Sequence, residues 1–343
     1  MKHLFETIIQ KLEMGESLVL ATVIGQQGSV PRSAGAKMVV CQNGIIYGTI
    51  GGGLVESNTI EKALETFKTQ KSKIFEFNMA SSGFNKGEMI CGGHLKIMIQ
   101  HLDSENKALV STFKNIIKAL KNHERAIMTT CINSKTYESD LVVLAQDLSP
   151  DPIKSLKFPQ NGHHLLINLK KPAIIEIDDQ QFWCEPLVIP ARLYLFGGGH
   201  VSQAVAAISH TIGFDTFVID DRPEIIRPEL FPADCILKLI LEFEHCFEKL
   251  DIDEHSYIVI VTRSHIYDMQ VLEQAVKSKA VYIGMMGSHR KKNTIFNHLA
   301  KNGITKAQLE KVHSPVGLPI NAETPAELAI SILGELVQKR GEK

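Results

Sequence analysis

Glycine-rich segments that also carry cations and hydroxyl groups occur in both halves of the chain, and their residue types are suited to binding an anion. In the first half, Gly28–Lys37 contains Ser29, Arg32 and Lys37. Arginine can grip a phosphate through paired hydrogen bonds, whereas lysine acts as a point charge. We therefore interpret Ser29, Arg32 and Lys37 as candidate ligand-binding residues. The alternative is a surface turn that merely carries cations.

Gly51, Gly52 and Gly53 form a second feature of the first half, directly before a helix that we predict over Val55–Thr69. A glycine turn at the start of a helix presents unpaired backbone N–H groups and the positive end of the helix dipole. Such a turn suits a phosphate or a carboxylate. Glu56 stands in the first turn of this helix, where it either belongs to the site or only complements the dipole.

The second half contains another glycine turn, which follows a predicted apolar strand. Gly197 and Gly199 match the first two glycines of the dinucleotide-binding fingerprint, and Ser202 stands at the third position. Gly197 would allow the turn, and Gly199 would let the backbone approach a pyrophosphate. Asp220 or Asp221, at the end of the next predicted strand, could accept a hydrogen bond from a ribose hydroxyl. The alternative is that the glycines serve only the packing of helix against strand.

Three histidines of the second half each follow a predicted strand: His200, His265 and His289. In a parallel sheet, the carboxyl ends of the strands meet at the edge where ligands bind, so we expect the three side chains there. His200 and His265 could donate hydrogen bonds to an oxyanion or a pterin, although chance placement on exposed loops is the alternative. Their wide spacing along the chain predicts no metal site.

Ser288 and Arg290 follow a glycine and open a predicted helix. A flexible backbone combined with cationic groups favours a phosphate as the ligand at this position. We interpret Ser288 and Arg290 as candidate binding residues. For Lys291 and Lys292, a solvated basic helix start is an equally good interpretation.

Cys91 has the most reactive setting among the cysteines, because two glycines and His94 follow it. The glycines permit close approach to the sulfur, and the histidine could promote the thiolate. A buried structural cysteine is the alternative. The six cysteines are scattered without a Cys-x-x-Cys pair, so the sequence predicts neither a disulfide framework nor a zinc site.

Regular elements must hold these residues, and their type changes along the chain. The first half combines a helix over residues 2–14 with apolar runs that alternate as strands, and Asn43-Gly44 predicts a hairpin turn. The other elements predicted in this half are strands at 17–24, 36–40, 45–50, 73–77, 95–100, 126–132, 141–145, 164–169 and 173–177 and a helix at 107–121.

From Arg192 onward, strands alternate with helices, which implies parallel strands joined by right-handed crossovers. The predicted strands are 192–196, 216–219, 255–261 and 280–283, and the predicted helices are 201–212, 267–277 and 292–302. The last helix has the clearest start, with Thr324 as N-cap, Pro325 at the first position and Glu327 completing a capping box.

The fold class is therefore α/β, with an N-terminal α+β domain over residues 1–185 and a C-terminal Rossmann-like parallel-sheet domain over 186–343. The boundary falls in Cys184–Pro190, where two prolines in an extended stretch resist helix formation. A subdivision of the first domain is expected near residues 103–125.

Composition excludes several classes of protein. The 343 residues carry a net charge of −1, so nothing electrostatic favours nucleic acid or an anionic membrane as a partner. No apolar run approaches the length that spans a bilayer, and the first residues lack the pattern of a signal peptide. We expect a cytoplasmic protein.

Taken together, the motifs resemble the xanthine dehydrogenase accessory protein family, also called the XdhC/CoxI family. The resemblance spans nearly the whole chain and is weakest over residues 103–185. The matching segments are Ala21–Val23, Gly28–Arg32, Gly35–Met38, Gly51–Glu56, Cys91–Gly93, Phe196–Val201, Asp220–Arg222, Thr262–His265, Gly287–Ser288, Pro315–Ile320 and Glu323–Pro325.

The resemblance implies a homodimeric chaperone that is not itself an enzyme. Members of this family bind the molybdenum cofactor, as molybdopterin or its dinucleotide form, and protect it while a cysteine desulfurase supplies the sulfido ligand. They then help to insert it into xanthine dehydrogenase or a related molybdenum hydroxylase. One departure concerns Leu54, because many members carry a cysteine there. The resemblance therefore implies that this chain lacks that thiol or uses Cys91 instead.

Two other functions remain open from the residues alone. An NAD(P)-dependent oxidoreductase would use the glycine fingerprint but leaves the N-terminal motifs unexplained, and no catalytic pair stands out at a persuasive spacing. A noncatalytic nucleotide sensor is the third hypothesis. Reduction of NAD(P) on addition of a substrate would select the oxidoreductase, and nucleotide binding that alters only partner affinity would select the sensor.

Overall fold

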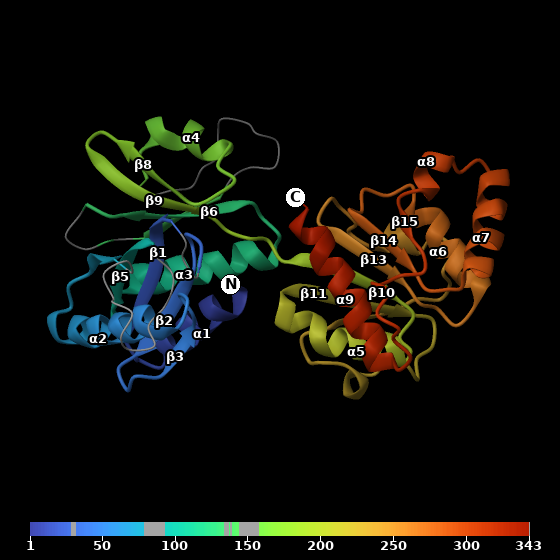
Figure 1. Ribbon diagram of the computed structural model, residues 1–343, viewed down its shortest axis with the longest axis horizontal. Helices are drawn as coiled ribbons and strands as arrows, with labels where there is room; N and C mark the ends of the chain where they lie inside the picture. The colour runs from blue at the N-terminus through green and yellow to red at the C-terminus, as the bar shows by residue number, and fades with distance from the viewer. Residues whose placement is uncertain (29–31, 79–92, 134–136, 138, 144–157, 343) are drawn as a thin grey trace. The chain divides into compact units, whose positions relative to one another are not determined.

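The computed structural model describes residues 1–28, 32–78, 93–133, 137, 139–143 and 158–342. The chain divides into two compact units, unit 1 (Met1–Ile189) and unit 2 (Pro190–Lys343) (Figure 1). Among the helices of these described residues, none is long and apolar enough to cross a membrane.

Unit 1 is built around a five-stranded antiparallel sheet in the order β3-β2-β1-β5-β4. Its strands are β1 (Leu18–Gln27), β2 (Lys37–Cys41), β3 (Ile46–Gly48), β4 (Lys73–Asn78) and β5 (His94–Leu102), and its helices are α1 (Lys2–Glu13), α2 (Gly53–Thr69) and α3 (Lys107–Lys121). The predicted turn at Asn43-Gly44 joins β2 and β3.

Alternation along β1 explains why helices cover both faces of this sheet. Leu18 and Leu20 pack with Phe5 of α1 and Phe113 of α3 on one face. Val19, Ala21 and Val23 face the other way and share a core with α2. Successive side chains of a strand point to opposite faces, so an uninterrupted apolar strand requires cover on both.

A four-stranded sheet in the order β7-β6-β9-β8 completes unit 1. Its strands are β6 (Ala126–Cys131), β7 (Ser139–Val143), β8 (Ala173–Ile177) and β9 (Gln180–Pro186). The strand expected over residues 164–169 is wrong, because α4 (His163–Ile167) forms there with Leu166 buried and Leu165 exposed. A short apolar run of this kind does not distinguish a strand from a helical turn.

Unit 2 contains a six-stranded sheet in the order β12-β11-β10-β13-β14-β15, and every pairing in it is parallel. Its strands are β10 (Ala191–Phe196), β11 (Phe214–Asp220), β12 (Ile236–Leu239), β13 (Ser256–Ile260), β14 (Tyr282–Met285) and β15 (Val312–His313). Its helices are α5 (His200–Ser209), α6 (His265–Ala275), α7 (His289–Lys301), α8 (Lys306–Leu309) and α9 (Pro325–Gly341).

The strand order confirms the predicted Rossmann-like fold. Consecutive strands run outward from β10 to β12, and the chain then returns to the other side of β10 with β13. In open parallel sheets, ligands bind beside the carboxyl ends of the strands where the order reverses. The gap between β10 and β13 is that switch point. The predicted capping box of α9 is also present, with Glu327 and Thr324 bonded to each other's backbone N–H.

Candidate functional site

Strand register brings the motifs of unit 1 to one end of the five-stranded sheet. Gln27 at the end of β1 pairs with His94 at the start of β5. Lys37 starts β2, and Gly48, which ends β3, pairs with the next residue of β2. The segment after Gln27, the turn after β3 and Gly93 therefore adjoin the same end of the sheet. Ser29 and Cys91, two of the predicted site residues, lie outside the described residues.

The glycine turn before α2 is closed by a carboxylate of the chain itself. Gly51, Gly52 and Gly53 all have positive φ, which other residues rarely adopt. The Gly52 N–H donates to Glu56 Oε2 at 3.2 Å, and the hydroxyl of Thr49 donates to the same oxygen at 2.7 Å. Glu56 thus binds back onto the turn, and a ligand anion at Gly52 would have to replace it.

Arg32 and Lys37 have different surroundings. Arg32 is exposed. Lys37 is buried, and its Nζ lies 2.5 Å from Glu185 Oε2, while Trp183 Nε1 donates to the same oxygen at 3.3 Å. Because Glu185 neutralises Lys37, Arg32 is the better placed of the two to meet a ligand anion from solvent.

Gly197 and Gly199, the outer glycines of the turn in unit 2, have different surroundings. Gly197 has a φ of 105°, and a Cβ there would overlap the carbonyl oxygen of Val261, so the turn requires glycine for its packing. A Cβ on Gly199 would instead meet open space, with no neighbouring atom within 4 Å. Gly199 precedes α5, whose start has no side-chain cap and whose first residue, His200, is exposed. Open space beside unpaired helix N–H groups fits a phosphate.

Asp220, at the end of β11, is 1% exposed and fully engaged. Its two oxygens accept hydrogen bonds from the Gly198 N–H at 2.8 Å and from the backbone and guanidinium of Arg222 at 2.8 to 3.0 Å. Burial acts to raise the pKa of Asp220, but these hydrogen bonds outweigh it and hold the pKa below its ordinary value. Asp220 therefore fixes the glycine turn to the end of β11.

Asp221 forms a paired ion contact with Arg263, one bond of which measures 2.8 Å from Nη2 to Oδ2. Arg263 also lies over the Tyr267 ring, with 4.9 Å from the guanidinium carbon to the ring centroid. In the sequence, Arg222 and Arg263 stand out only as members of longer motifs. Their contacts with neighbouring acids depend on the order of strands in the sheet, which local sequence does not reveal.

The three histidines lie at the carboxyl edge of the sheet, as expected. His200, His265 and His289 are the first residues of α5, α6 and α7, and all three are exposed. Ser288 caps α7 by accepting the Lys291 N–H at 3.3 Å, and Arg290 is exposed.

Lys291 turns inward instead of remaining a solvated cation. Its Nζ contacts the buried carboxylate of Asp268 and donates to the Met286 carbonyl at 3.0 Å. The other oxygen of Asp268 accepts from the Thr262 hydroxyl at 2.7 Å. This cluster joins the ends of β13 and β14, and the sequence signal for it was only the cationic run after Gly287.

A further network that the sequence reasoning missed surrounds Glu335 on α9. Its carboxylate accepts the Tyr282 hydroxyl at 2.5 Å and the Gly317 N–H at 2.7 Å, and it lies 2.8 Å from His313 Nδ1. The Tyr282 ring packs at a tilt against the ring of His313, with 4.7 Å between ring centroids. The network fastens the segment after β15 to α9.

Most described thiols are poor nucleophiles. Burial raises the pKa of Cys184 and of Cys246 to about 12 and that of Cys235 to about 11. Within the part of the chain that the structure describes, no group of three or more histidine, cysteine, aspartate or glutamate residues could hold a metal ion.

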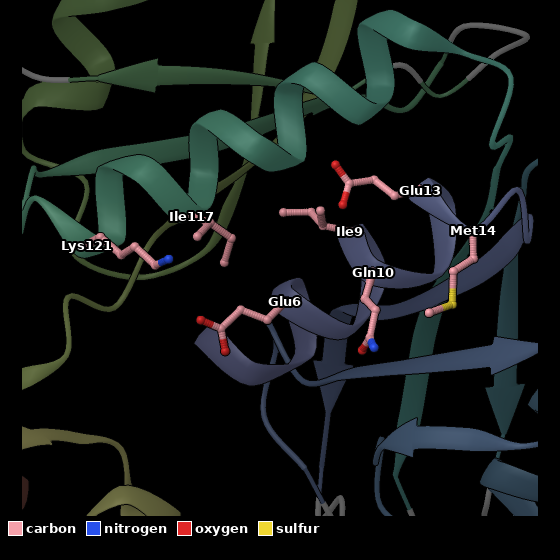
Figure 2. Close-up of a pocket in the computed structure, with 7 residues that line it drawn as sticks. All are labelled: Glu6, Ile9, Gln10, Glu13, Met14, Ile117 and Lys121. Carbon is pink, nitrogen blue, oxygen red and sulfur yellow. The ribbon is translucent and has the colours of Figure 1, made fainter. Parts of the chain in front are cut away.

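A groove of about 400 Å³ runs along α1 and α3 (Figure 2). Two carboxylates, Glu6 and Glu13, and Lys121 line it together with apolar side chains. It contains none of the residues that the sequence marks as candidates, so it does not belong to the motif sites.

Comparisons with known proteins agree with this architecture. One family model, described as the XdhC Rossmann domain, matches residues 193–336, and a second, described as the XdhC and CoxI family, matches residues 12–78. A crystal structure titled as a xanthine dehydrogenase from Bacillus halodurans has a TM-score of 0.81 at 22% identity, and the match covers 100% of this chain and 96% of that one. At this identity the likeness shows the fold.

Relatives of similar sequence carry three names. The chain is 25% identical over 336 residues to the Uncharacterized protein YqeB of Escherichia coli K12, covering 98% of this chain but 46% of that protein, so it spans about half of that relative's length. It is 26% identical over 349 residues to a Bacillus subtilis 168 protein named as a probable xanthine dehydrogenase subunit, covering 98% and 97%. It is 21% identical over 332 residues to the Molybdenum cofactor insertion chaperone PaoD of Escherichia coli K12, covering 97% and 86%.

Proposed function

Because the chain belongs to the XdhC and CoxI family, we propose that it is a chaperone that binds the molybdenum cofactor and delivers it to a molybdenum enzyme. One relative is named as a molybdenum cofactor insertion chaperone and another as a probable xanthine dehydrogenase subunit, which supports this proposal. The client is then xanthine dehydrogenase or a related molybdenum hydroxylase.

The observation that carries the proposal is the register of unit 1, which places Gly28, the turn after β3 and Gly93 at one end of a single sheet. Gln27 and His94 are paired, so Gly28 and Gly93 adjoin the same end of the sheet. An ordinary dinucleotide-binding enzyme needs only the glycine turn of unit 2. A second polar site fits a ligand that combines a phosphate with a polar pterin head.

Each proposed contact is weak by itself. An exposed contact between an anion and a helix end contributes on the order of 1 kcal/mol or less. In unit 1, Ser29, Arg32 and the turn before α2 would contact the phosphate or the pterin, and Lys37 would support them from the interior. In unit 2, the proposed contacts are Gly197, Gly199, His200, His265, Ser288 and Arg290, and Asp220 supports them by fixing the glycine turn.

A finer part of the proposal concerns sulfur. We propose that a cysteine desulfurase supplies the sulfido ligand while the chain holds the cofactor, and that Cys91 is the thiol involved. The high pKa of Cys184 and Cys246 supports this choice, because neither is a thiolate at neutral pH. Leu54, at the position where many family members carry cysteine, is exposed in the first turn of α2.

We also propose that the chain acts as a homodimer in the cytoplasm. Light scattering on the purified protein measures the first point directly, and fractionation of cells measures the second. A monomer that still retained the cofactor would remove the dimer from the proposal without affecting cofactor binding.

Anaerobic loading tests the proposed function. The purified chain is incubated with molybdenum cofactor or, in parallel, with NAD, passed through a desalting column, and assayed for molybdenum, pterin fluorescence and nucleotide. Arg32→Ala should lose most of the retained cofactor. Lys107→Ala, an exposed cation at the opposite end of the same sheet, is the matched control and should retain it.

Retention of NAD without pterin would replace the chaperone by an oxidoreductase or a nucleotide sensor. The geometry of Asp220 speaks against the usual mode of NAD binding. All of its hydrogen bonds are made within the chain, whereas a ribose hydroxyl would need a carboxylate that is able to accept.

A further inference from the structure

Four charged side chains gather beyond the ends of β11 and β13, and two of them have no role in the proposals above. Asp220 holds Arg222, and Asp221 holds Arg263. In the first pair, the Asp220 side chain is 2% exposed and that of Arg222 is 28% exposed. The second pair is more accessible, with the side chains 13% exposed for Asp221 and 39% for Arg263.

Sheet order fixes where the second pair lies. β10 stands between β11 and β13, Asp221 directly follows β11, and Arg263 follows β13. Neighbouring strands are about 4.8 Å apart, so the pair bridges roughly 10 Å across the carboxyl end of β10. The glycine turn leaves the sheet at that same end. A pyrophosphate bound at this glycine turn would lie next to the Asp221–Arg263 pair.

The charges around Arg263 favour an anion. Asp220 raises the pKa of Arg222 through its hydrogen bond, whereas Arg263 acts to lower it, so the two guanidinium groups are close enough to repel each other. Asp221 offsets that repulsion. If its carboxylate turned away, Arg222 and Arg263 would be left with the single buried counter-charge of Asp220. A phosphate group could then take the place of Asp221.

Arg263 also has contacts that do not depend on Asp221. Its guanidinium lies on the Tyr267 ring and donates to the Tyr267 hydroxyl at 3.3 Å. These contacts come from α6 and not from Asp221, so they can hold the side chain when the ion pair opens. Arginine also binds phosphate through the same paired geometry that it uses with carboxylate.

We propose that Arg263 is an anion-binding residue at the carboxyl edge of the unit 2 sheet, and that Asp221 pairs with its guanidinium until a pyrophosphate ester replaces the carboxylate. The proposal rests on the function proposed above and specifies which residues would recognise the phosphate end of the ligand. It reverses the expectation that Asp221 accepts a hydrogen bond from a ribose hydroxyl, because Asp221 now competes with the ligand.

Isothermal titration of the full-length chain tests this with two probes, inorganic pyrophosphate and ADP, which separate recognition of the anion from recognition of a nucleoside. Asp221→Asn should tighten pyrophosphate binding by up to about five-fold, the range that accessible ion pairs cover. Arg263→Gln should weaken the binding of both probes by a factor at least as large. When Asp221→Asn is added to Arg263→Gln, the affinity for either probe should not change further.

The matched control is Glu273→Gln. It changes the net charge by the same amount and releases Lys277, just after α6, from its ion pair with Glu273. It should leave both affinities unchanged. Thermal melting of every variant establishes that it folds, and Arg263→Lys replaces Arg263→Gln if the latter does not. ADP that binds no more tightly than pyrophosphate would assign recognition to the anion alone.

Several results would overturn the proposal. Weaker binding of ADP in Asp221→Asn would make Asp221 a ribose acceptor, unchanged affinity in Arg263→Gln would remove the arginine from the site, and no binding of either probe by any variant would remove the site. Loading with molybdenum cofactor is scored separately. If the chain failed to retain the molybdenum cofactor, the proposed function would be lost, but the expected pyrophosphate affinities of the variants would be unchanged.

Discussion

Lys37 and Glu185 form a buried ion pair that joins the two sheets of unit 1. Lys37 begins β2 of the five-stranded sheet, Glu185 lies in β9 of the four-stranded sheet, and Nζ and Oε2 are 2.5 Å apart. Their side chains are 2% and 1% exposed. The pair connects the segment that carries Arg32 to the rest of the unit.

Removing one partner of this pair should destabilise the chain strongly. Glu185→Gln leaves the ammonium of Lys37 without a counter-charge in the interior, which costs about 3–5 kcal/mol in comparable cases. The double variant Lys37→Met with Glu185→Gln should recover part of that loss, because no buried charge then remains. Urea unfolding of the single variants and of the double variant measures both the loss of stability and its partial recovery. A loss below about 1 kcal/mol for Glu185→Gln would contradict the assignment.

The Glu335 network should make stability depend on pH in the acid range. Burial acts to raise the pKa of Glu335, but hydrogen bonds from His313, Tyr282 and Gly317 outweigh it and hold the pKa below the ordinary 4.5. A lowered native pKa means that the carboxylate stabilises the fold above about pH 4.5, and that this contribution is lost as the pH falls through the native pKa.

Glu335→Gln should therefore lower the free energy of unfolding at pH 7 by about 1.5–3 kcal/mol, the range for hydrogen bonds to a charged group. A series of urea titrations at different pH values measures this effect. The difference in the free energy of unfolding between Glu335→Gln and the natural chain should shrink as the pH is lowered below about 5. Glu310→Gln, on an exposed helix side chain, is the control. A difference that stayed constant down to the acid limit would show that Glu335 does not act through its charge.

The two outer glycines of the unit 2 turn should respond differently to alanine. Gly197→Ala introduces a Cβ against Val261 at a positive φ and should lower the melting temperature markedly. Gly199→Ala meets open space and has an ordinary φ of −69°, so the melting temperature should hardly change. Its added methyl group should instead reduce retention of the cofactor. Equal melting losses in both variants would contradict this division.

Leu54→Cys should create a reactive thiol. Residue 54 is exposed in the first turn of α2, where the helix dipole favours a thiolate. We expect it to react with iodoacetamide at about pH 7 faster than Cys184, whose pKa burial raises to about 12. Mass spectrometry of the modified peptides compares the two rates in one sample. Equal rates would mean that the start of α2 does not activate a thiol.

Local signals predicted much of the fold. The apolar runs, the turn at Asn43-Gly44 and the capping box at Thr324 depend on neighbouring residues, and each appears in the structure. The short strands β12 and β15 were missed, because a few residues at a sheet edge carry no distinct period. The helix over His163–Ile167 was predicted as a strand, because a short apolar run does not distinguish a strand from a helical turn.

The candidate sites were predictable only in part. Glycine spacing and strand ends indicated the turn at Gly197 and the edge position of the histidines. The partners of Lys37, Arg263 and Glu335 lie 148, 42 and 22 residues away, and no pattern in the sequence pairs them. Those contacts exist because tertiary packing brings distant strand ends together, and the local spacing of residues does not predict that packing.

Cofactor retention after anaerobic desalting decides whether this chain binds the molybdenum cofactor. We predict molybdenum and pterin in near-stoichiometric amounts with the natural chain and with Lys107→Ala, and a large loss of both with Arg32→Ala. Retention of NAD with no pterin in the natural chain would contradict this prediction, as would equal molybdenum retention in Arg32→Ala and Lys107→Ala.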